Sequence, residues 1–558
     1  MLILFYILVI AVCLLPLVPG IVGVVLSSFS YIPILGLNHF SLDGFRQVFE
    51  WHGIWHSISL TLYTALLSTY LACLMTFSIL QASWNSKIWR FIERTLAPLL
   101  AMPHVAFAIG FAFLFAPTGM ASRIFYDWFS YDPNAQAVPS LALLVKDPYG
   151  LGLIFMLALK EVPFLLLMSI PILQQLKVSD TQKICSSLGY NNASTWLKSL
   201  LPQWLVKMRF PLMAVLAYSA SVVDVALVIG PTQPPTFAVL VWQWFNEPDL
   251  SLMPRAAAGA MTLLALISSL IGLLHLIEYA AIRRWKCWQF SGRYHLPLLG
   301  RSVYLFIALN TVLIAILIVI WSFAQRWRFP DLLPSRYSFH FWQDEWFSVA
   351  QTVESSLLLA VISASIALFL AIIAHEYRLR YRLSIPDYFI ALPMLLPQLS
   401  VLFGMQIVTL YFETNAYLFW VSWSHVFFAF PFIYLSLDGP WRSYDQNLTR
   451  AALSLGKAPL HIWFKIKLPI LFPAISFAWA VGTSVSLAQY LPTLILGAGR
   501  ISTITTEAVA LSSGFDRRIT AIYAIWQALL PLLFFSLAFI VSRLAFKYHR
   551  LHLRNLNQ

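Results

Sequence analysis

Residues 450–469 read RAALSLGKAPLHIWFKIKLP, and residues 183–202 read KICSSLGYNNASTWLKSLLP. Both are polar stretches between long apolar runs, and each contains Leu-Gly, a Trp seven residues after the Gly, and Leu-Pro ending thirteen residues after it. The offset between the two copies is a constant 267 residues, as from Gly189 to Gly456. The matched residues are Leu188, Gly189, Trp196, Leu201 and Pro202 in the first copy and Leu455, Gly456, Trp463, Leu468 and Pro469 in the second. The repetition predicts a chain built from two similar units.

The composition indicates a membrane protein. Of 558 residues, 60% are hydrophobic and 11% are charged, whereas soluble domains carry about 25% charged residues. The apolar residues come in runs of about twenty, which suits a hydrocarbon core of about 30 Å. Helices are the expected spanning structure, because the alternating ten-residue segments of a barrel are not seen. The predicted fold class is an all-α polytopic membrane protein.

Twelve spans are predicted, six in each half of the chain. They lie near residues 2–26, 54–80, 96–116, 150–173, 205–230 and 256–282, and then 303–324, 349–374, 388–412, 417–437, 470–496 and 519–546. Because six is even, both halves enter the membrane in the same orientation, as parallel repeats do in transporters. The predicted units are residues 1–290 and 291–558.

The net charge of +13 is distributed unevenly among the loops. Loops after even-numbered spans, with the C-terminal tail, hold 25 Lys and Arg, and loops after odd-numbered spans hold 10. Excess Lys and Arg marks the cytoplasmic side, so both termini and both copies of the repeated stretch are expected in the cytoplasm. The basic clusters directly adjoin spans, which favours lipid contact over nucleic-acid binding.

Further matched residues extend the repeat beyond the polar stretch. Pro103 precedes Gly110 by seven residues, as Pro397 precedes Gly404. Pro163-Phe164 and Pro431-Phe432 each lie some 25 residues before the repeated Leu-Gly. Their common order favours duplication over chance.

The polar stretches resemble the cytoplasmic signature of permease subunits in binding-protein-dependent ABC importers. That signature is Glu-Ala-Ala, three residues, Gly, nine residues, Ile, one residue and Leu-Pro. The second copy matches at Ala451, Ala452, Gly456, Ile466 and Leu468-Pro469, with Arg450 in place of Glu. The first copy matches at the Gly and Leu-Pro, with Lys183 where Glu stands. The whole chain resembles fused two-unit permeases found among thiamine and ferric-iron importers.

The resemblance implies a transport subunit of the bacterial inner membrane. Each signature loop would form a coupling helix that docks on an ATP-hydrolysing subunit, with two such subunits and one periplasmic substrate-binding protein per chain. The Gly would permit a tight turn, and Trp196 and Trp463 would supply apolar anchors at the interface. Pro202 and Pro469 would bend the chain where it enters the next span. The reversed charge at Lys183 and Arg450 requires a different contact at that point.

Enzymatic motifs are not found in the sequence. The Gly456-Lys457 pair lacks the rest of a phosphate-binding loop, so ATP hydrolysis is assigned to a separate subunit, and no cofactor is expected. Cysteines and histidines show no metal-ligand spacing, so no metal site is expected. An ion-gradient-driven secondary transporter with two six-span halves is the alternative interpretation, but it leaves the paired loops unexplained.

Polar residues inside spans are costly and are candidates for function. The span after the first loop holds Ser219, Ser221 and Asp224, and the corresponding span of the second half holds Ser484, Ser486, Gln489 and Tyr490. In the family that this chain resembles, this span lines the central path, so these residues are predicted to line it. Asp224 would favour a cation. Glu278 is expected to pair with Arg283 or Arg284.

Overall fold

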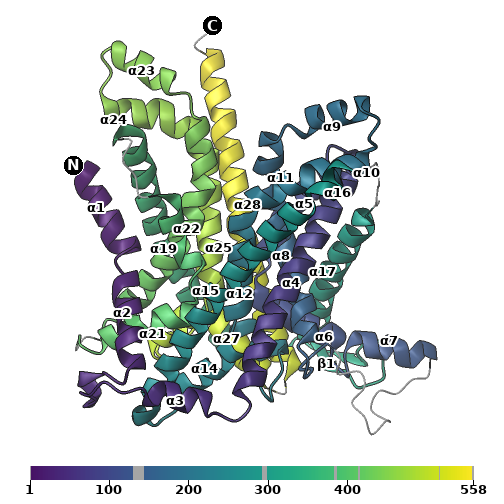
Figure 1. The fold of residues 1–558 in the computed structure, drawn as a ribbon, viewed down its shortest axis with the longest axis vertical. Coiled ribbons are helices and arrows are strands. Elements are labelled where there is room, and N and C mark those ends of the chain that lie inside the picture. Colours follow the sequence, from purple (N-terminus) through teal and green to yellow (C-terminus); the bar gives the residue numbers. More distant parts are fainter. Residues whose placement is uncertain are drawn as a thin grey trace.

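The computed structural model describes residues 2–129, 144–291, 298–381, 386–412, 415–514 and 516–555. Long helices run side by side along the molecule (Figure 1). The regular β-structure in the described residues is one short antiparallel pair, β1 (Ala324–Arg326) with β2 (Arg336–Tyr337). The predicted all-α class is therefore confirmed.

The two halves repeat the same order of long helices. The first half contains α1 (Leu2–Cys13) and α2 (Leu17–Ser28), which together form one candidate span, and then α4 (Ile54–Ser83), α6 (His104–Phe115), α8 (Leu151–Gln175), α12 (Arg209–Ser221) and α15 (Met253–Arg284). The second half contains α17 (Gly300–Phe323), α19 (Trp346–Tyr381), α21 (Gln398–Thr409), α22 (Tyr417–Ser443), α25 (Leu468–Ala488) and α28 (Arg517–Asn555).

Ten helical segments within the described residues are long and apolar enough to cross a membrane. The predicted fifth span is a pair of helical segments bent by 64° at Met208, and α21, in the predicted ninth span, is only 12 residues long. The third span begins later than predicted, because Pro103 separates α5 (Lys87–Ala101) from α6. A proline cannot donate the backbone hydrogen bond that would continue the helix.

The first long helix of each half packs against the other half. Helix α2 lies against α21, and α17 lies against α6. A Cβ on Gly404 would come within 1.8 Å of the Gly20 carbonyl oxygen, and one on Gly110 would come within 2.3 Å of Ile314. Gly110 and Gly404 are the matched glycines of the sequence repeat, so the same small residue permits the same close helix contact in both halves.

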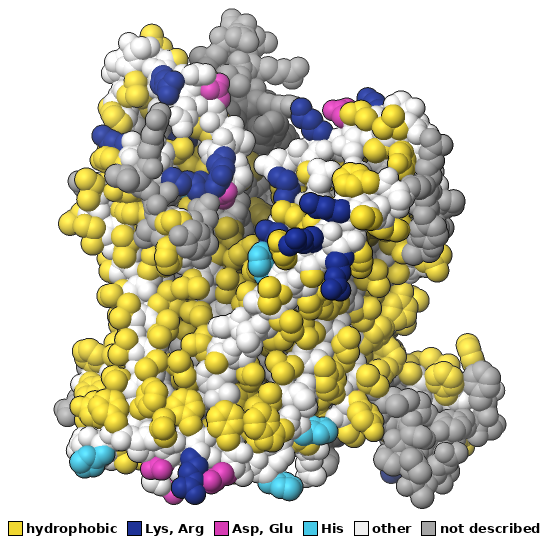
Figure 2. Space-filling model, in the orientation of Figure 1, with side chains coloured by type: hydrophobic (Ala, Val, Ile, Leu, Met, Phe, Trp, Pro, Cys, Tyr) yellow, Lys and Arg dark blue, Asp and Glu magenta, His cyan; other side chains and the backbone are white. Residues whose placement is uncertain are grey.

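The face of the molecule shown in Figure 2 is divided into bands along its length. In Figure 2 the middle of the visible face is largely hydrophobic, and most of the visible Lys and Arg side chains lie toward the upper end. The upper end also carries α9 (Val178–Ser187) and α23 (Gln446–Ser454), while α3 (Asp43–Phe49) and α14 (Phe237–Phe245) lie at the lower end (Figure 1). The apolar middle is suited to contact lipid.

The boundary predicted between residues 290 and 291 follows α16 (Lys286–Phe290). Residues 292–297 lie outside the described residues. The two-unit division remains a prediction.

Candidate functional site

The repeated stretches fold into two similar structures, here called the first repeat segment (residues 178–207) and the second repeat segment (residues 445–474). In each, a short helix ends in a turn, and a π-helical turn then leads into the next helix. The π-helical turns are Thr195–Leu200 and Trp463–Lys467, and they continue into α11 (Leu201–Lys207) and α25. The short helices end at Ser187 and Ser454, and the π-helical turns end at Leu200 and Lys467, so each pair of ends is 267 residues apart.

Gly189 and Gly456 occupy equivalent left-handed turns. Their φ angles are +80° and +75°, which favour glycine because L side chains strain there. A Cβ on Gly456 would meet no atom within 4 Å, so its requirement for glycine comes from the backbone and not from crowding. The expectation of a tight turn at both glycines agrees with this geometry.

The prolines do not bend the chain where the sequence suggested. Pro202 and Pro469 are the second residues of α11 and α25, each directly after a π-helical turn. The wider turn accommodates a residue that cannot donate to the preceding carbonyl. The 64° bend of the first half lies six residues further on, at Met208.

The two tryptophans hold the repeat segments onto their own chain. Trp196 is fully buried, and its ring makes an edge contact with Phe77 of α4 at 5.9 Å between centroids. Trp463 is half-buried and donates from Nε1 to Glu376 Oε1 of α19 at 3.3 Å. The interpretation of Trp196 as an anchor for a partner is therefore wrong for this conformation, because its side chain is enclosed by this chain.

Glu376 fastens the second repeat segment to the bundle. Lys467 Nζ lies 2.5 Å from Glu376 Oε1, and Trp441 Nε1 also donates to that oxygen at 3.1 Å. In the first segment, Lys198 Nζ donates to the carbonyls of Trp288 in α16 and of Ser291, which follows α16. The two segments thus have similar shapes but different attachments.

Exposed apolar side chains mark the outer surface of both segments. Leu188 and Leu455 occupy equivalent positions before the glycine and are 59% and 77% exposed. The other large apolar residues exposed on the segments include Ile184, Leu448, Leu453, Leu460 and Phe464. Exposed apolar clusters on otherwise polar segments are typical of partner contacts.

The remaining signature residues differ in how far their side chains are exposed. Lys183, Arg450 and Ala451 are exposed, whereas Ala452 is buried. Leu201, Ile466 and Leu468 are half-buried. Both reversed charges therefore face away from the helix bundle.

The predicted path residues surround two helix breaks at equivalent positions. Helix α12 ends at Ser221 and α13 (Asp224–Ile229) begins three residues later. Helix α25 ends at Ala488, and α26 (Leu491–Gly497) begins three residues later. Gln489 and Tyr490 lie in the second break. Interrupted helices of this kind are typical of substrate sites in transporters.

Asp224 links the two breaks electrostatically. It interacts with His104 and Tyr218 in its own half and with Tyr490 of the other half. His104 in turn pairs with Glu161 at 3.1 Å. Asp224 and Tyr490 are far apart in the sequence but lie within electrostatic range of each other in the structure.

The other predicted path residues differ in their surroundings. Ser486 Oγ lies 2.8 Å from His425 Nδ1, and Thr493 Oγ1 lies 2.9 Å from His425 Nε2. Both side-chain amide atoms of buried Gln489, and the hydroxyl of buried Ser219, have no hydrogen-bond partner among the described residues. Ser221 donates to the Ala217 carbonyl of its own helix, and Ser484 is half-buried.

Sequence reasoning misses the partner of Glu278. For His104 and His425, whose positions carry no spacing signal, it predicts packing or a hydrogen bond to a neighbouring helix, and both lie within hydrogen-bond distance of side chains on other helices. Glu278 pairs with Arg209 Nε at 2.8 Å and not with Arg283 or Arg284. Arg209 directly follows the bend at Met208, and the bend brings Arg209 against Glu278 of α15.

Comparisons with known proteins decide the family. No protein-family model matches the chain. The inner membrane ABC transporter permease protein YnjC of Escherichia coli (strain K12) is 31% identical over 521 residues, which cover 92% of each chain. The chain belongs to the ABC transporter permeases. It is a multi-pass inner-membrane permease subunit of an ABC importer. The alternative interpretation, a secondary transporter driven by an ion gradient, is therefore wrong.

Shorter matches connect this permease to other permease proteins. The spermidine/putrescine transport system permease protein PotC of Escherichia coli (strain K12) is 27% identical over 155 residues, 25% of this chain and 54% of its own. The putrescine transport system permease protein PotI of that strain is 26% identical over 165 residues, 26% of this chain and 58% of its own. These relatives are named as transport proteins, not as enzymes.

Proposed function

We propose that the two repeat segments dock two ATP-binding subunits, which hydrolyse ATP for this permease. The observation that carries the proposal is the matched pair of segments at one end of the molecule, each with a left-handed glycine turn and exposed leucine. The outward-facing Lys183 and Arg450 would contact acidic groups of those subunits. Two docking segments in one chain imply one permease chain for two ATP-binding subunits.

The docking proposal also sets an orientation. The segments and both termini would be cytoplasmic, which agrees with the excess of Lys and Arg in those loops. A periplasmic binding protein would then deliver a small solute to the opposite end, where α3 and α14 lie (Figure 1). Closure of the ATP-binding subunits would move both repeat segments and switch access between the two sides.

The test of docking uses Gly456→Val, because a β-branched residue is strained at φ +75°. Affinity purification of the unchanged permease from detergent-solubilised membranes should recover an ATP-binding subunit, identified by mass spectrometry. The variant should lose this subunit and ATP-dependent uptake while still inserting into the membrane. Pro469 variants provide a second test of the same segment.

The matched control is Gly499→Val. Gly499 has φ +71° and also has open space around a Cβ, but it lies between α26 and α27 (Ile504–Ser512), outside both repeat segments. It should keep the ATP-binding subunit. Full recovery of that subunit with Gly456→Val would contradict docking at the second segment.

We further propose that the solute passes the two helix breaks and carries positive charge. The half-buried carboxylate of Asp224 supports this, since it lies within electrostatic range of Tyr490 of the other half. Two relatives are named for transport of spermidine and putrescine, which are amines. The unpartnered Gln489 and Ser219 would hydrogen-bond to a passing solute or its water.

Asp224→Asn tests this path by removing one charge with little change of shape. Uptake of a cationic solute should fall at least about tenfold, because a charge-assisted contact contributes about 1.5–3 kcal/mol. Uptake of radiolabelled spermidine and putrescine in membrane vesicles is the measurement. Asp127→Asn, an exposed aspartate on α7 (Met120–Phe129), is the control. An equal loss of uptake in both variants, or no loss in either, would contradict the proposal that a cationic solute passes Asp224.

A further inference from the structure

A cavity of about 380 Å³ lies where the two halves meet at the end of α17. Arg123 of α7 reaches it from the first half, and Trp321, Trp327 and Arg517 reach it from the second. The function proposed above leaves these residues without a role.

The cavity has an excess of positive charge. Its walls include three guanidinium groups, from Arg123, Arg517 and Arg518, and one carboxylate, from Asp516. That carboxylate is already held by Arg518, with Nη2 and Oδ2 2.7 Å apart. Two positive charges therefore remain in excess.

Arg123 and Arg517 form no ion pair with any carboxylate among the described residues. Arg123 is only 2% exposed and donates to the backbone carbonyls of Thr118, Arg328 and Asp331, while the Asp331 carboxylate attracts it from a longer distance. Arg517 donates to Thr118 Oγ1 at 2.8 Å. Neutral oxygens orient these groups without cancelling their charges.

A stack of four side chains holds the two arginines. Arg517 lies over Trp321 at 5.3 Å, the Trp321 and Trp327 rings are 4.5 Å apart, and Arg123 lies over Trp327 at 5.0 Å. Cation–π contacts stabilise the guanidinium groups but leave their charges in place. Two fixed cations at a shared cavity are suited to an oxyanion such as phosphate.

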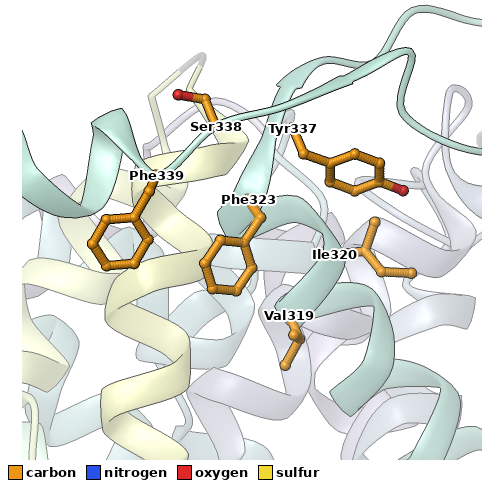
Figure 3. Close-up of a pocket in the computed structure, with 6 residues that line it drawn as sticks. All are labelled: Val319, Ile320, Phe323, Tyr337, Ser338 and Phe339. Carbon is orange, nitrogen blue, oxygen red and sulfur yellow. The ribbon is translucent and has the colours of Figure 1, made fainter.

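The cavity lies beside surfaces that are suited to contact the membrane. Leu305, Val312 and Val319 are exposed along α17, which is suited to face lipid. A second, apolar cavity of about 490 Å³ occupies another face of the last turns of α17, between Val319, Phe323 and Phe339 (Figure 3).

Helix α7, which carries Arg123, also presents aromatic side chains outward. Phe125 and Trp128 are 50% and 74% exposed. Aromatic side chains at helix ends mark the membrane interface. The cavity is therefore expected near the membrane interface, at the end of α17.

We propose that this cavity binds the phosphate of an anionic phospholipid, which bridges Arg123 and Arg517. The bound lipid would join α7 of one half to α28 of the other, so it would stabilise the contact between halves. On the orientation proposed above, this phospholipid would lie in the periplasmic leaflet; the binding site itself does not depend on that orientation.

The test measures thermal unfolding of the purified permease in detergent. Phosphatidylglycerol should raise the Tm relative to an equal amount of zwitterionic phosphatidylcholine, because a ligand that binds the folded state stabilises it. Arg517→Gln should weaken the apparent affinity for phosphatidylglycerol at least about tenfold. Arg517→Lys, which keeps a charge, should weaken it less.

Arg500→Gln is the matched control. Arg500 also lies over an aromatic ring, Tyr417 at 4.5 Å, but outside the cavity. It should respond to phosphatidylglycerol as the unchanged permease does.

Three outcomes would overturn the proposal. One is an equal phosphatidylglycerol response with Arg517→Gln, and another is the same response to inorganic phosphate alone. The third is no lipid response together with loss of binding-protein-dependent uptake in Arg517→Gln, which would indicate protein docking instead. The unfolding assay needs no ATP-binding subunit, so its result is independent of the docking proposal.

Discussion

At the residue scale, one carboxylate organises the attachment of the second repeat segment. Glu376 accepts from Trp441 and Trp463 and pairs with Lys467, whose side chain is 8% exposed. Taking a Lys ammonium out of water is costly unless a carboxylate compensates. This pair therefore holds the segment in one position while leaving its leucines exposed.

Replacing Glu376 alone should destabilise the permease more than replacing both Glu376 and Lys467. Glu376→Gln should cost about 3 kcal/mol, because Lys467 stays buried without a counter-charge. The double variant Glu376→Gln with Lys467→Met should recover most of that loss. Denaturant unfolding in detergent is the measurement. Arg46→Gln, which breaks an exposed pair with Glu50, should leave stability unchanged; equal losses in the single and double variants would argue against a buried charge pair.

At the element scale, glycines decide which helices approach closely. Gly20, Gly23 and Gly404 let α2 and α21 meet backbone to backbone, and Gly110 admits Ile314 of α17 against α6. Without a hydrophobic driving force between helices in lipid, such close packing supplies much of their attraction. Helices α2 and α17, each of which packs against the other half, thus join the halves at two equivalent contacts.

Gly404→Ala should separate α2 from α21 and cost about 1–3 kcal/mol of stability through overpacking. The added Cβ would lie 1.8 Å from the Gly20 carbonyl oxygen, which cannot move without shifting α2. Gly272→Ala in α15 is the matched control, since nothing lies within 4 Å of its Cβ. It should be neutral or slightly stabilising. Thermal unfolding in detergent compares the two; equal Tm values would contradict the close contact.

At the scale of the whole molecule, the two halves depend on each other. Helix α17 packs on α4 and α6 of the first half, and α1 and α2 pack on α19 and α21 of the second. Each half expressed alone would expose these contact surfaces. The unit boundary at residues 290 and 291 is therefore a division of sequence whose halves we expect to fold together.

Splitting the chain tests this dependence. Residues 1–290 and 291–558 expressed as two chains in one cell should purify together through a tag on either one. Each fragment expressed alone should be degraded or should aggregate, because the helix that packs against the other half would then have no partner. Co-purification in detergent, followed by unfolding of the complex, is the measurement. Stable, monodisperse fragments that do not associate would contradict the packing described here.

The sequence by itself determined the membrane class, the internal repeat and the two polar segments. Hydrophobic run length and matched spacing are local properties, and they suffice for those conclusions. The positions of Gly189 and Gly456 at left-handed turns also follow from residue type, since glycine favours that backbone. The family resemblance rested on the same spacing.

Only the tertiary structure decided which residues meet across the chain. The burial of Trp196, the pairing of Glu278 with Arg209 and the electrostatic interaction of Asp224 with Tyr490 depend on helices that are distant in sequence. The first half bends at Met208 and not, as the sequence suggested, at Pro202. Pro202 follows a π-helical turn, which accommodates it without a bend. Contacts of this kind depend on how helices cross, and periodicity along one chain does not encode that crossing.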